Sequence, residues 1–136
     1  MAIVSDKLKK LLEGSGLEYQ ASSYYLRGTL KLAGGRTQMW FIDPKTDSVG
    51  DYEDHDILSP IADLGTHRAK VEKKAFRLLE FNGKRRLGHV CVMGGMALFK
   101  ADCSVDVSPE AFRSVVEEVC RVADALENSL TEGDSF

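Results

Sequence analysis

The sequence predicts an α+β domain in which a twisted antiparallel sheet of about five strands packs against helices from the beginning, middle and end of the chain. The pairs Gly34-Gly35 and Gly94-Gly95 each stand between runs of β-favouring residues, as in β-hairpins. Helical patterns flank these hairpins and do not alternate with single strands, which excludes a doubly wound parallel sheet. The 136 residues match the size of one domain, so we expect a single domain over residues 1–136.

The first third of the chain predicts one short helix and one hairpin. Ser5 can cap the helix, and residues 14–16 end it after two to three turns. Its apolar residues recur at helical spacing: Leu8, Leu11 and Leu12. The hairpin follows over residues 17–42 and turns at Gly34-Gly35, where a positive φ costs little.

The rest of the chain predicts an edge strand, a helix, the second hairpin and a long final helix. Residues 56–62 indicate a short edge strand in which Pro60 marks an edge or a bulge. A helix is expected over residues 66–82. The hairpin over residues 87–105 is apolar on both flanks, so part of it should be central and covered by a helix. Ser108-Pro109-Glu110 opens a helix of about 20 residues, and we expect residues 130–136 to be a frayed tail.

Charge and cysteine usage exclude several classes of protein. The net charge is −3 and the pI about 5.6, which disfavours a nucleic-acid partner. No apolar run approaches the ~20 residues of a membrane span, and no secretory signal opens the chain, so we expect a cytoplasmic protein with no membrane partner. Cys91, Cys103 and Cys120 form no Cys-x-x-Cys pair, and we expect each to be buried as a small hydrophobe.

The second half of the chain resembles the YbjN family. The residues that carry the resemblance are 78–82, which precede a Gly-containing strand, 107–110 at the start of the final helix, and Ala123-Asp124 and Leu130 within that helix. The similarity covers residues 69–130 well and residues 1–64 mainly by the order of the elements, whereas the segment 43–56 does not align. The family shares the fold of type III secretion chaperones, so the resemblance implies that fold, a homodimer, and chaperone-like or regulatory binding of another protein. It brings no catalytic residues, and we expect neither enzymatic activity nor a cofactor.

An acidic segment leaves a cation site open as an alternative. Between residues 43 and 63 a single base, Lys45, stands among the following acids: Asp43, Asp47, Asp51, Glu53, Asp54, Asp56 and Asp63. Hard cations bind clustered carboxylates, and His55 lies among these. The spacing does not fit an EF-hand, because Lys45 stands where the second ligand should be. We therefore favour a solvated loop whose charges protect a sheet edge, and predict no metal site.

A basic segment follows over residues 67–86, where eight bases stand against Glu72 and Glu80. Lys70, Lys74 and Arg77 recur at helical spacing, so we expect them on a helix face that would steer acidic partners. A solvated helix face is the simpler interpretation. The scarcity of interleaved aromatic residues argues against nucleic acid.

Aromatic residues of the first hairpin supply the other candidate contacts. Tyr24-Tyr25 and Trp40-Phe41 are adjacent pairs, so one member of each should point away from the buried face of a strand. An outward aromatic side chain anchors a partner, forms a dimer contact or lies under a covered second face. We choose Tyr25, Trp40 and Phe41 as candidate contacts for a partner segment that lies along the sheet or adds to its edge.

A small-ligand site, a metal site or an enzyme built on His89 and Cys91 is the alternative function. The two residues are two positions apart in a strand, so they share one face. A catalytic thiol needs an activating base and a third orienting group. No Gly-x-Ser-x-Gly or similar motif surrounds either residue, so we rank this function behind protein binding.

Overall fold

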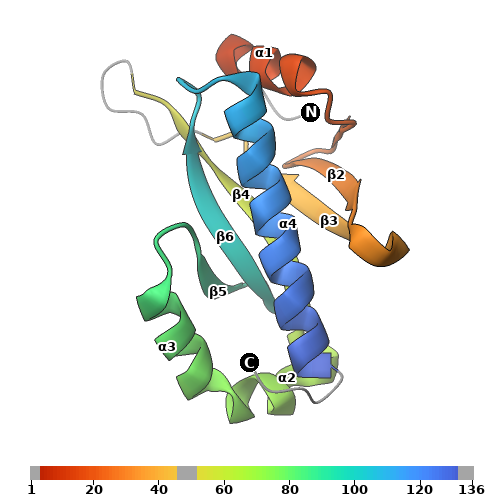
Figure 1. Ribbon diagram of the computed structural model, residues 1–136, viewed down its shortest axis with the longest axis vertical. Coiled ribbons are helices and arrows are strands. Elements are labelled where there is room, and N and C mark those ends of the chain that lie inside the picture. The colour runs from red at the N-terminus through yellow and green to blue at the C-terminus, as the bar shows by residue number, and fades with distance from the viewer. Residues whose placement is uncertain (1–3, 46–51, 132–136) are drawn as a thin grey trace.

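The chain folds as an α+β protein in which helices pack against one six-stranded antiparallel sheet (Figure 1). The structure is a computed structural model, and it describes residues 4–45 and 52–131. The helices are α1 (Asp6–Ser15), α2 (Leu64–Lys73), α3 (Ala75–Lys84) and α4 (Pro109–Thr131). The strands are β1 (Gln20–Ala21), β2 (Leu26–Lys31), β3 (Thr37–Ile42), β4 (Asp54–Asp63), β5 (His89–Met93) and β6 (Met96–Ser104).

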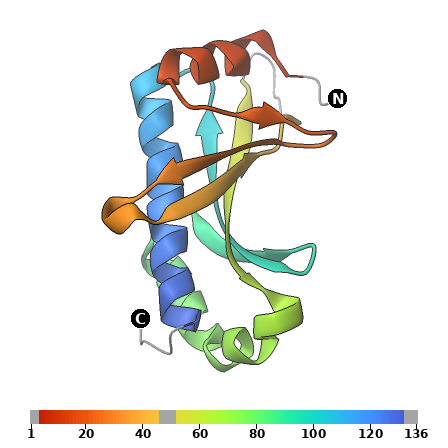
Figure 2. The same cartoon turned by 90° about the vertical axis from the view of Figure 1, so that its right-hand side faces the viewer.

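The strands lie in the order β1-β2-β3-β4-β6-β5, and α4 crosses one face of this sheet (Figure 2). It contacts β3, β4 and β6, while α1 packs on α4 and α2 and α3 lie at the end of the molecule opposite α1. One side of α4 is buried in the core: Phe112, Val116, Val119, Cys120, Val122, Ala123, Leu126 and Leu130. The predicted fold class, a twisted antiparallel sheet with helices, is confirmed.

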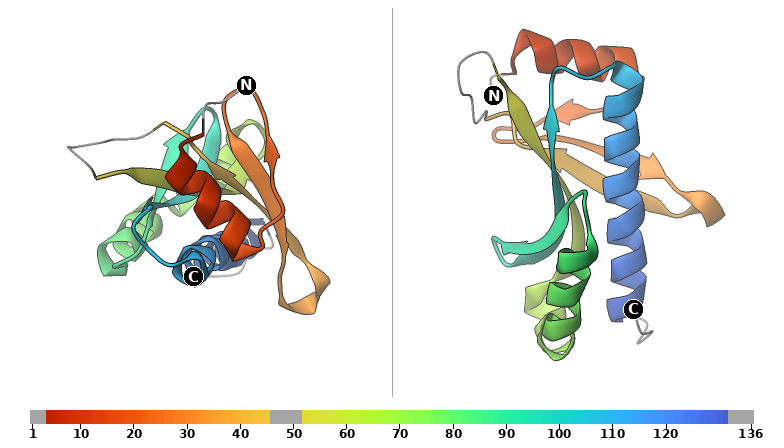
Figure 3. Two further views of the ribbon diagram at one scale, coloured as in Figure 1. Left: turned by 90° about the horizontal axis from the view of Figure 1, so that it is seen from above. Right: turned by 60° about the vertical axis from the view of Figure 1, so that its left-hand side comes forward.

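The sheet twists sharply between β3 and β4, which pair only at Phe41–Leu58 and Ile42–Ile57. Beyond these pairs the β2–β3 hairpin turns steeply away from β4 and β6 (Figure 3). In the gap, the Gln38 amide donates to the Pro60 carbonyl (2.8 Å) and to the Ser59 hydroxyl (2.9 Å). The Ser59 hydroxyl in turn donates to the Met39 carbonyl. These buried side chains bond carbonyl groups that a continued strand ladder would otherwise pair.

The prediction of a short edge strand at residues 56–62 is wrong, because β4 is a ten-residue central strand between β3 and β6. The acids Asp54 and Asp56 suggested an edge, but Asp56 lies opposite Asp102 of β6 and pairs with it through the ladder. Pro60 does mark a bulge, since the register with β6 shifts between Pro60 and Ala62. A bulge leaves room for a residue that has no N–H to donate.

The helix predicted over residues 66–82 is two helices, α2 and α3, which meet at Lys74 (φ −103°, ψ 9°). The Asp63 side chain caps α2 by accepting from the Gly65 N–H (2.9 Å). At the break, Lys74 donates to the Ser129 carbonyl near the end of α4 (2.7 Å). The predicted continuous basic face through Lys70, Lys74 and Arg77 is therefore interrupted, because one member turns toward α4.

The expected frayed tail over residues 130–136 is wrong at its first residue. Leu130 is buried in the core and belongs to the last turns of α4. The apolar side chain extends the buried side of the helix by a turn, which outweighs the tendency of a chain end to fray. Residues 132–136 lie outside the described residues.

Gly88 is expected to be the glycine of the second hairpin that tolerates substitution least. Its φ is +78°, and an added Cβ would stand 2.5 Å from Cζ of Phe99 and 2.9 Å from the Lys100 carbonyl oxygen. We expect Gly88→Ala to lower the free energy of unfolding by about 2–4 kcal/mol through backbone strain and overlap. Gly94→Ala is the matched control, because φ is also positive there (+56°) but no atom lies within 4 Å. Urea unfolding of both variants would contradict this account if their losses were equal.

Candidate protein-binding face

The face of the sheet opposite α4 is the candidate site. Among the described residues, no helix covers the centre of this face, which we call the open face (Figure 2). Strand alternation and register decide which side chains lie on it. One row runs across four strands through His89, Lys100, Leu58 and Phe41.

Apolar side chains lie on several strands of the open face. Tyr25 and Phe41 meet edge to face, with ring centroids 6.2 Å apart. Met39 is 41% exposed and Met93 46% exposed. Met96, the third methionine among the described residues, pairs with Met93 and so shares this face. Methionine side chains are flexible and polarisable, and such side chains are common on surfaces that bind varied partners.

A pair of carboxyl groups borders these apolar residues. Asp56 and Asp102 are directly opposite across β4 and β6, and Lys100 bonds Asp56 at 3.2 Å. A hydrogen bond with Asp56, together with burial and the charge of Asp56, raises the pKa of Asp102 to about 6. For Asp56, burial acts in the opposite direction but is outweighed by hydrogen bonds with Asp102 and Lys100, which lower its pKa. Near neutral pH the pair therefore carries more negative charge than Lys100 balances.

His89 and Cys91 also lie on the open face, as strand alternation predicts. His89 pairs with Lys100 and Cys91 with Leu98. Burial raises the pKa of the Cys91 thiol, which is the opposite of what a nucleophilic thiolate needs. The expected burial is confirmed for Cys103 and Cys120, whereas Cys91 is only half-buried. We find no arrangement here that activates the thiol.

The expected outward position of Trp40 is wrong. Trp40 is 0% exposed and lies on the α4 side of β3, so it cannot meet a partner on the folded surface. Phe41 and Tyr25 do lie on the open face. Strand alternation requires one of two neighbours to face inward, but it does not say which, and the larger indole ring fills the core.

The predicted basic contacts do not adjoin the open face. Lys70 is on α2, Arg77 is on α3 and Lys74 lies between the two helices. Both helices are at the end of the molecule opposite α1 (Figure 1). The charged groups of the open face itself include Asp56 and Asp102 on β4 and β6, Lys100 beside them, and Arg27, which lies opposite Phe41. The structure thus separates the aromatic and basic candidate residues that we had expected to act together.

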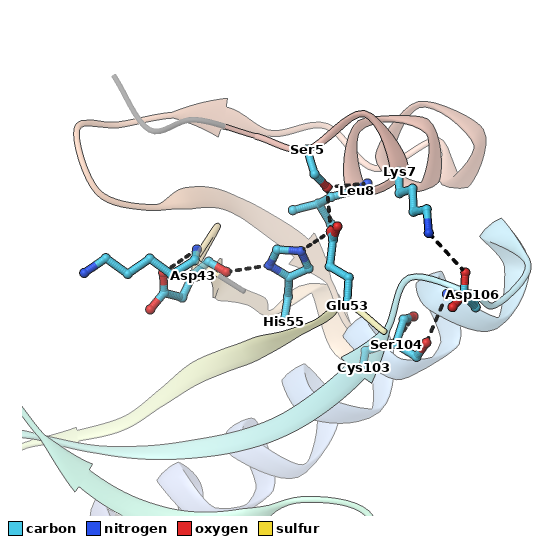
Figure 4. A network of polar contacts seen from close by, with 10 residues as sticks. Ser5, Lys7, Leu8, Asp43, Glu53, His55, Cys103, Ser104 and Asp106 are labelled. Carbon is cyan, nitrogen blue, oxygen red and sulfur yellow. Dashed lines mark hydrogen bonds and ion pairs between the residues drawn. The ribbon is translucent and has the colours of Figure 1, made fainter. Parts of the chain in front are cut away.

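The acidic segment is partly organised by a network of hydrogen bonds around the buried His55 ring (Figure 4). His55 bonds the Asp43 carbonyl oxygen through Nδ1 (2.9 Å) and Glu53 Oε2 through Nε2 (2.6 Å). Ser5, the N-cap of α1, donates to the same carboxylate and accepts from the Leu8 N–H. The network joins α1, the end of β3 and the start of β4 around one imidazole ring.

No group of three or more potential ligands among the described residues is arranged to hold a metal ion. Glu53 and His55 bond each other, while Asp47 and Asp51 lie outside the described residues.

A scan against models of known protein families found no match to this chain, and a search of curated proteins found none either. None of the described helices combines the length and apolar character needed to cross a bilayer.

Sequence reasoning missed Met39, Met93, Met96 and the Asp56–Asp102 pair. For β6 the sequence does hold a signal. Every second residue of a strand lies on the same face, so Met96 and Asp102 could have been assigned to one face together with Leu98 and Lys100. No local signal places Asp56 opposite Asp102, since they are 46 positions apart and only the strand register brings them together.

Proposed function

We propose that this protein is a non-enzymatic protein-binding module, chaperone-like or regulatory, whose open face takes an apolar segment of a partner that also carries basic side chains. The observation that carries the proposal is the open face itself, where Met39, Phe41 and Met93 stand without a covering helix among the described residues. Solvent-exposed apolar groups gathered on one face are typical of interaction sites.

The charge on the open face supports a basic partner segment. Asp56 and Asp102 share one flank of the apolar area with a single lysine, Lys100. A lysine or arginine of the partner placed over the two carboxyls would relieve the repulsion between like charges directly opposite in a sheet. The apolar side chains would supply the buried area, and the carboxyls the preference for charge.

The resemblance to the YbjN family supports two further parts of the proposal. We propose that the module is a homodimer, to be tested by sedimentation equilibrium. We also propose that it acts in the cytoplasm, which agrees with three cysteines that form no disulfide.

Binding of a basic amphipathic peptide tests the open face. We expect a labelled 14-residue peptide of alternating Leu and Lys to bind at least about tenfold more tightly than its Leu-Glu counterpart. Met39→Asp with Met93→Asp should abolish most of this binding, whereas Val92→Asp is the control, since Val92 is exposed on the other face of β5. Binding should also strengthen from about pH 5 to about pH 7, because Asp102, with a pKa of about 6, becomes charged.

Fluorescence anisotropy measures all of these affinities. Equal affinity for the Lys and Glu peptides would contradict the charge argument. If the double aspartate variant and Val92→Asp both bound the Leu-Lys peptide with the affinity of the wild type, the open face would not be the binding site.

A further inference from the structure

A second surface, on the outer side of α3, carries the two most exposed apolar side chains of the helices. Phe76 is 74% exposed and Leu79 67% exposed. The opposite side of α3 is packed, with Leu78 buried and Phe81 in edge-to-face contact with Phe99. These two exposed residues therefore contribute nothing to the core that holds α3 in place.

The spacing on the outer side of α3 fits contact with another helix. Phe76, Leu79 and Gly83 occupy positions i, i+3 and i+7, which lie along one stripe of a helix. A Cβ at Gly83 would have no atom within 4 Å, so the stripe is open at that position. Partner helices dock on stripes of this spacing, with large side chains as anchors.

Basic residues stand before, within and after α3, and several of them form no ion pair with the described residues. Those that are exposed and take part in none of the ion pairs of the described residues are Lys73, Arg77, Lys84 and Arg86. Two neighbouring cations do form ion pairs, because Arg68 pairs with Glu72 and Arg85 pairs with Glu118. Glu80 also lies beside Phe76 and Leu79, but the exposed cations near α3 outnumber it, so net positive charge is left to complement a partner.

We propose that the outer side of α3 docks an acidic amphipathic helix of another protein, with Phe76 and Leu79 as the anchors. Aromatic and aliphatic side chains at the centre of a contact supply affinity, and the rim of cations supplies attraction at a distance and selects an acidic partner. This surface is separate from the open face, because Phe81 places α3 against Phe99, whose side chain lies on the α4 side of the sheet.

Glu80 favours a protein over an anionic membrane surface as the occupant. It is exposed, next to Leu79 in sequence and one turn after Phe76. An anionic lipid surface is negatively charged over its whole area. Insertion of Phe76 and Leu79 would therefore bring lipid phosphates close to the Glu80 carboxylate, which they repel. A helix can place its acids opposite the lysines and arginines and leave Glu80 in water.

A designed peptide pair tests the proposal by fluorescence anisotropy. The probe is an 18-residue peptide with Leu at helical i, i+3, i+4 and i+7 positions and Glu and Ala between them. The comparison peptide has the same composition in an order without the apolar stripe. We expect the probe to bind at least about tenfold more tightly than the comparison peptide, and to weaken as salt is raised.

Phe76→Ser with Leu79→Ser should reduce the affinity for the probe at least about tenfold. Tyr24→Ser is the matched control, because Tyr24 is 78% exposed but lies on the first hairpin. Circular dichroism should report unchanged unfolding for both variants, since the replaced side chains are mostly in solvent.

Three results would overturn the proposal. The double serine variant could bind the probe as wild type does, or the comparison peptide could bind equally well. Alternatively, vesicles of phosphatidylserine and phosphatidylcholine could bind in a manner that depends on Phe76 and Leu79 while the probe does not, which would assign this surface to a membrane.

Discussion

Trp40→Ala is expected to lower the free energy of unfolding by about 3–5 kcal/mol. The indole is fully buried between the sheet and the helices, in the same core as Leu26 and Ile42. Gly28 leaves the space that the ring occupies, because a Cβ there would stand 2.3 Å from Cζ2 of Trp40. Truncation would leave a large cavity that this tightly packed region cannot close.

The measurement is urea unfolding followed by circular dichroism, since Trp40 is the only tryptophan and its fluorescence is lost in the variant. Met39→Ala, the neighbouring residue on the open face, should cost about 1 kcal/mol or less. Trp40→Phe should keep most of the stability, because the indole Nε1 has no hydrogen-bond partner to lose. A loss below about 1 kcal/mol in Trp40→Ala would show that the ring is not part of the core.

His55→Leu is expected to lower the free energy of unfolding by about 2–4 kcal/mol, because it removes two hydrogen bonds of a buried ring. The ring is 1% exposed, and both of its nitrogens bond oxygen atoms. The Asp43 carbonyl can only accept, so the ring donates to it from Nδ1, and Nε2 shares a hydrogen bond with the Glu53 carboxyl group. The leucine variant would leave the Glu53 carboxyl group and the Asp43 carbonyl each without one hydrogen-bond partner in a largely buried place.

Glu53→Gln separates the charge of this network from its shape. Burial acts to raise the pKa of Glu53, but hydrogen bonds from Ser5 and His55, together with the charges of His55 and Lys7, hold it below 4.5. A carboxyl with a lowered folded-state pKa stabilises the fold above its unfolded pKa, and that stability is lost as the pH falls through the folded value. The wild type should therefore lose stability below about pH 4.5 more steeply than Glu53→Gln.

Urea midpoints measured between about pH 3 and about pH 7 provide the comparison. The charge of Lys7, on α1, also acts on this carboxylate, and Lys7 forms an ion pair with Asp106 (3.9 Å). Lys7→Ala is therefore a useful control, because it removes a distant charge without removing a hydrogen bond. Parallel pH profiles for wild type and Glu53→Gln would show that Glu53 titrates alike in the folded and unfolded chain.

The local signals of the sequence predicted the ends of several elements correctly. Ser5 caps α1 and Ser108 begins the last helix, where its hydroxyl accepts from the Ala111 N–H. Gly34-Gly35 and Gly94-Gly95 turn the two hairpins with positive φ. Capping and turn conformation depend on a few neighbouring residues, so they are visible in the sequence.

The candidate sites could be predicted only in part. The aromatic pairs indicated a surface on the first hairpin, and Phe41 and Tyr25 are on it, but Trp40 is not. The basic segment predicted a positively charged helix face, but it did not predict that the helix breaks at Lys74. No glycine or proline signals that break, and the bond from Lys74 to Ser129 joins residues 55 positions apart.

The sequence by itself determined the fold class, the hairpin turns and the amphipathic final helix, because these follow from periodicity and from backbone preferences within a few residues. Only the tertiary structure decided that β4 is central, that Trp40 faces α4, that Asp56 meets Asp102, and that Ser5 and Glu53 join around His55. Strand order, register and the inward face are set by how distant segments fill a common volume, and no neighbouring residue carries that information.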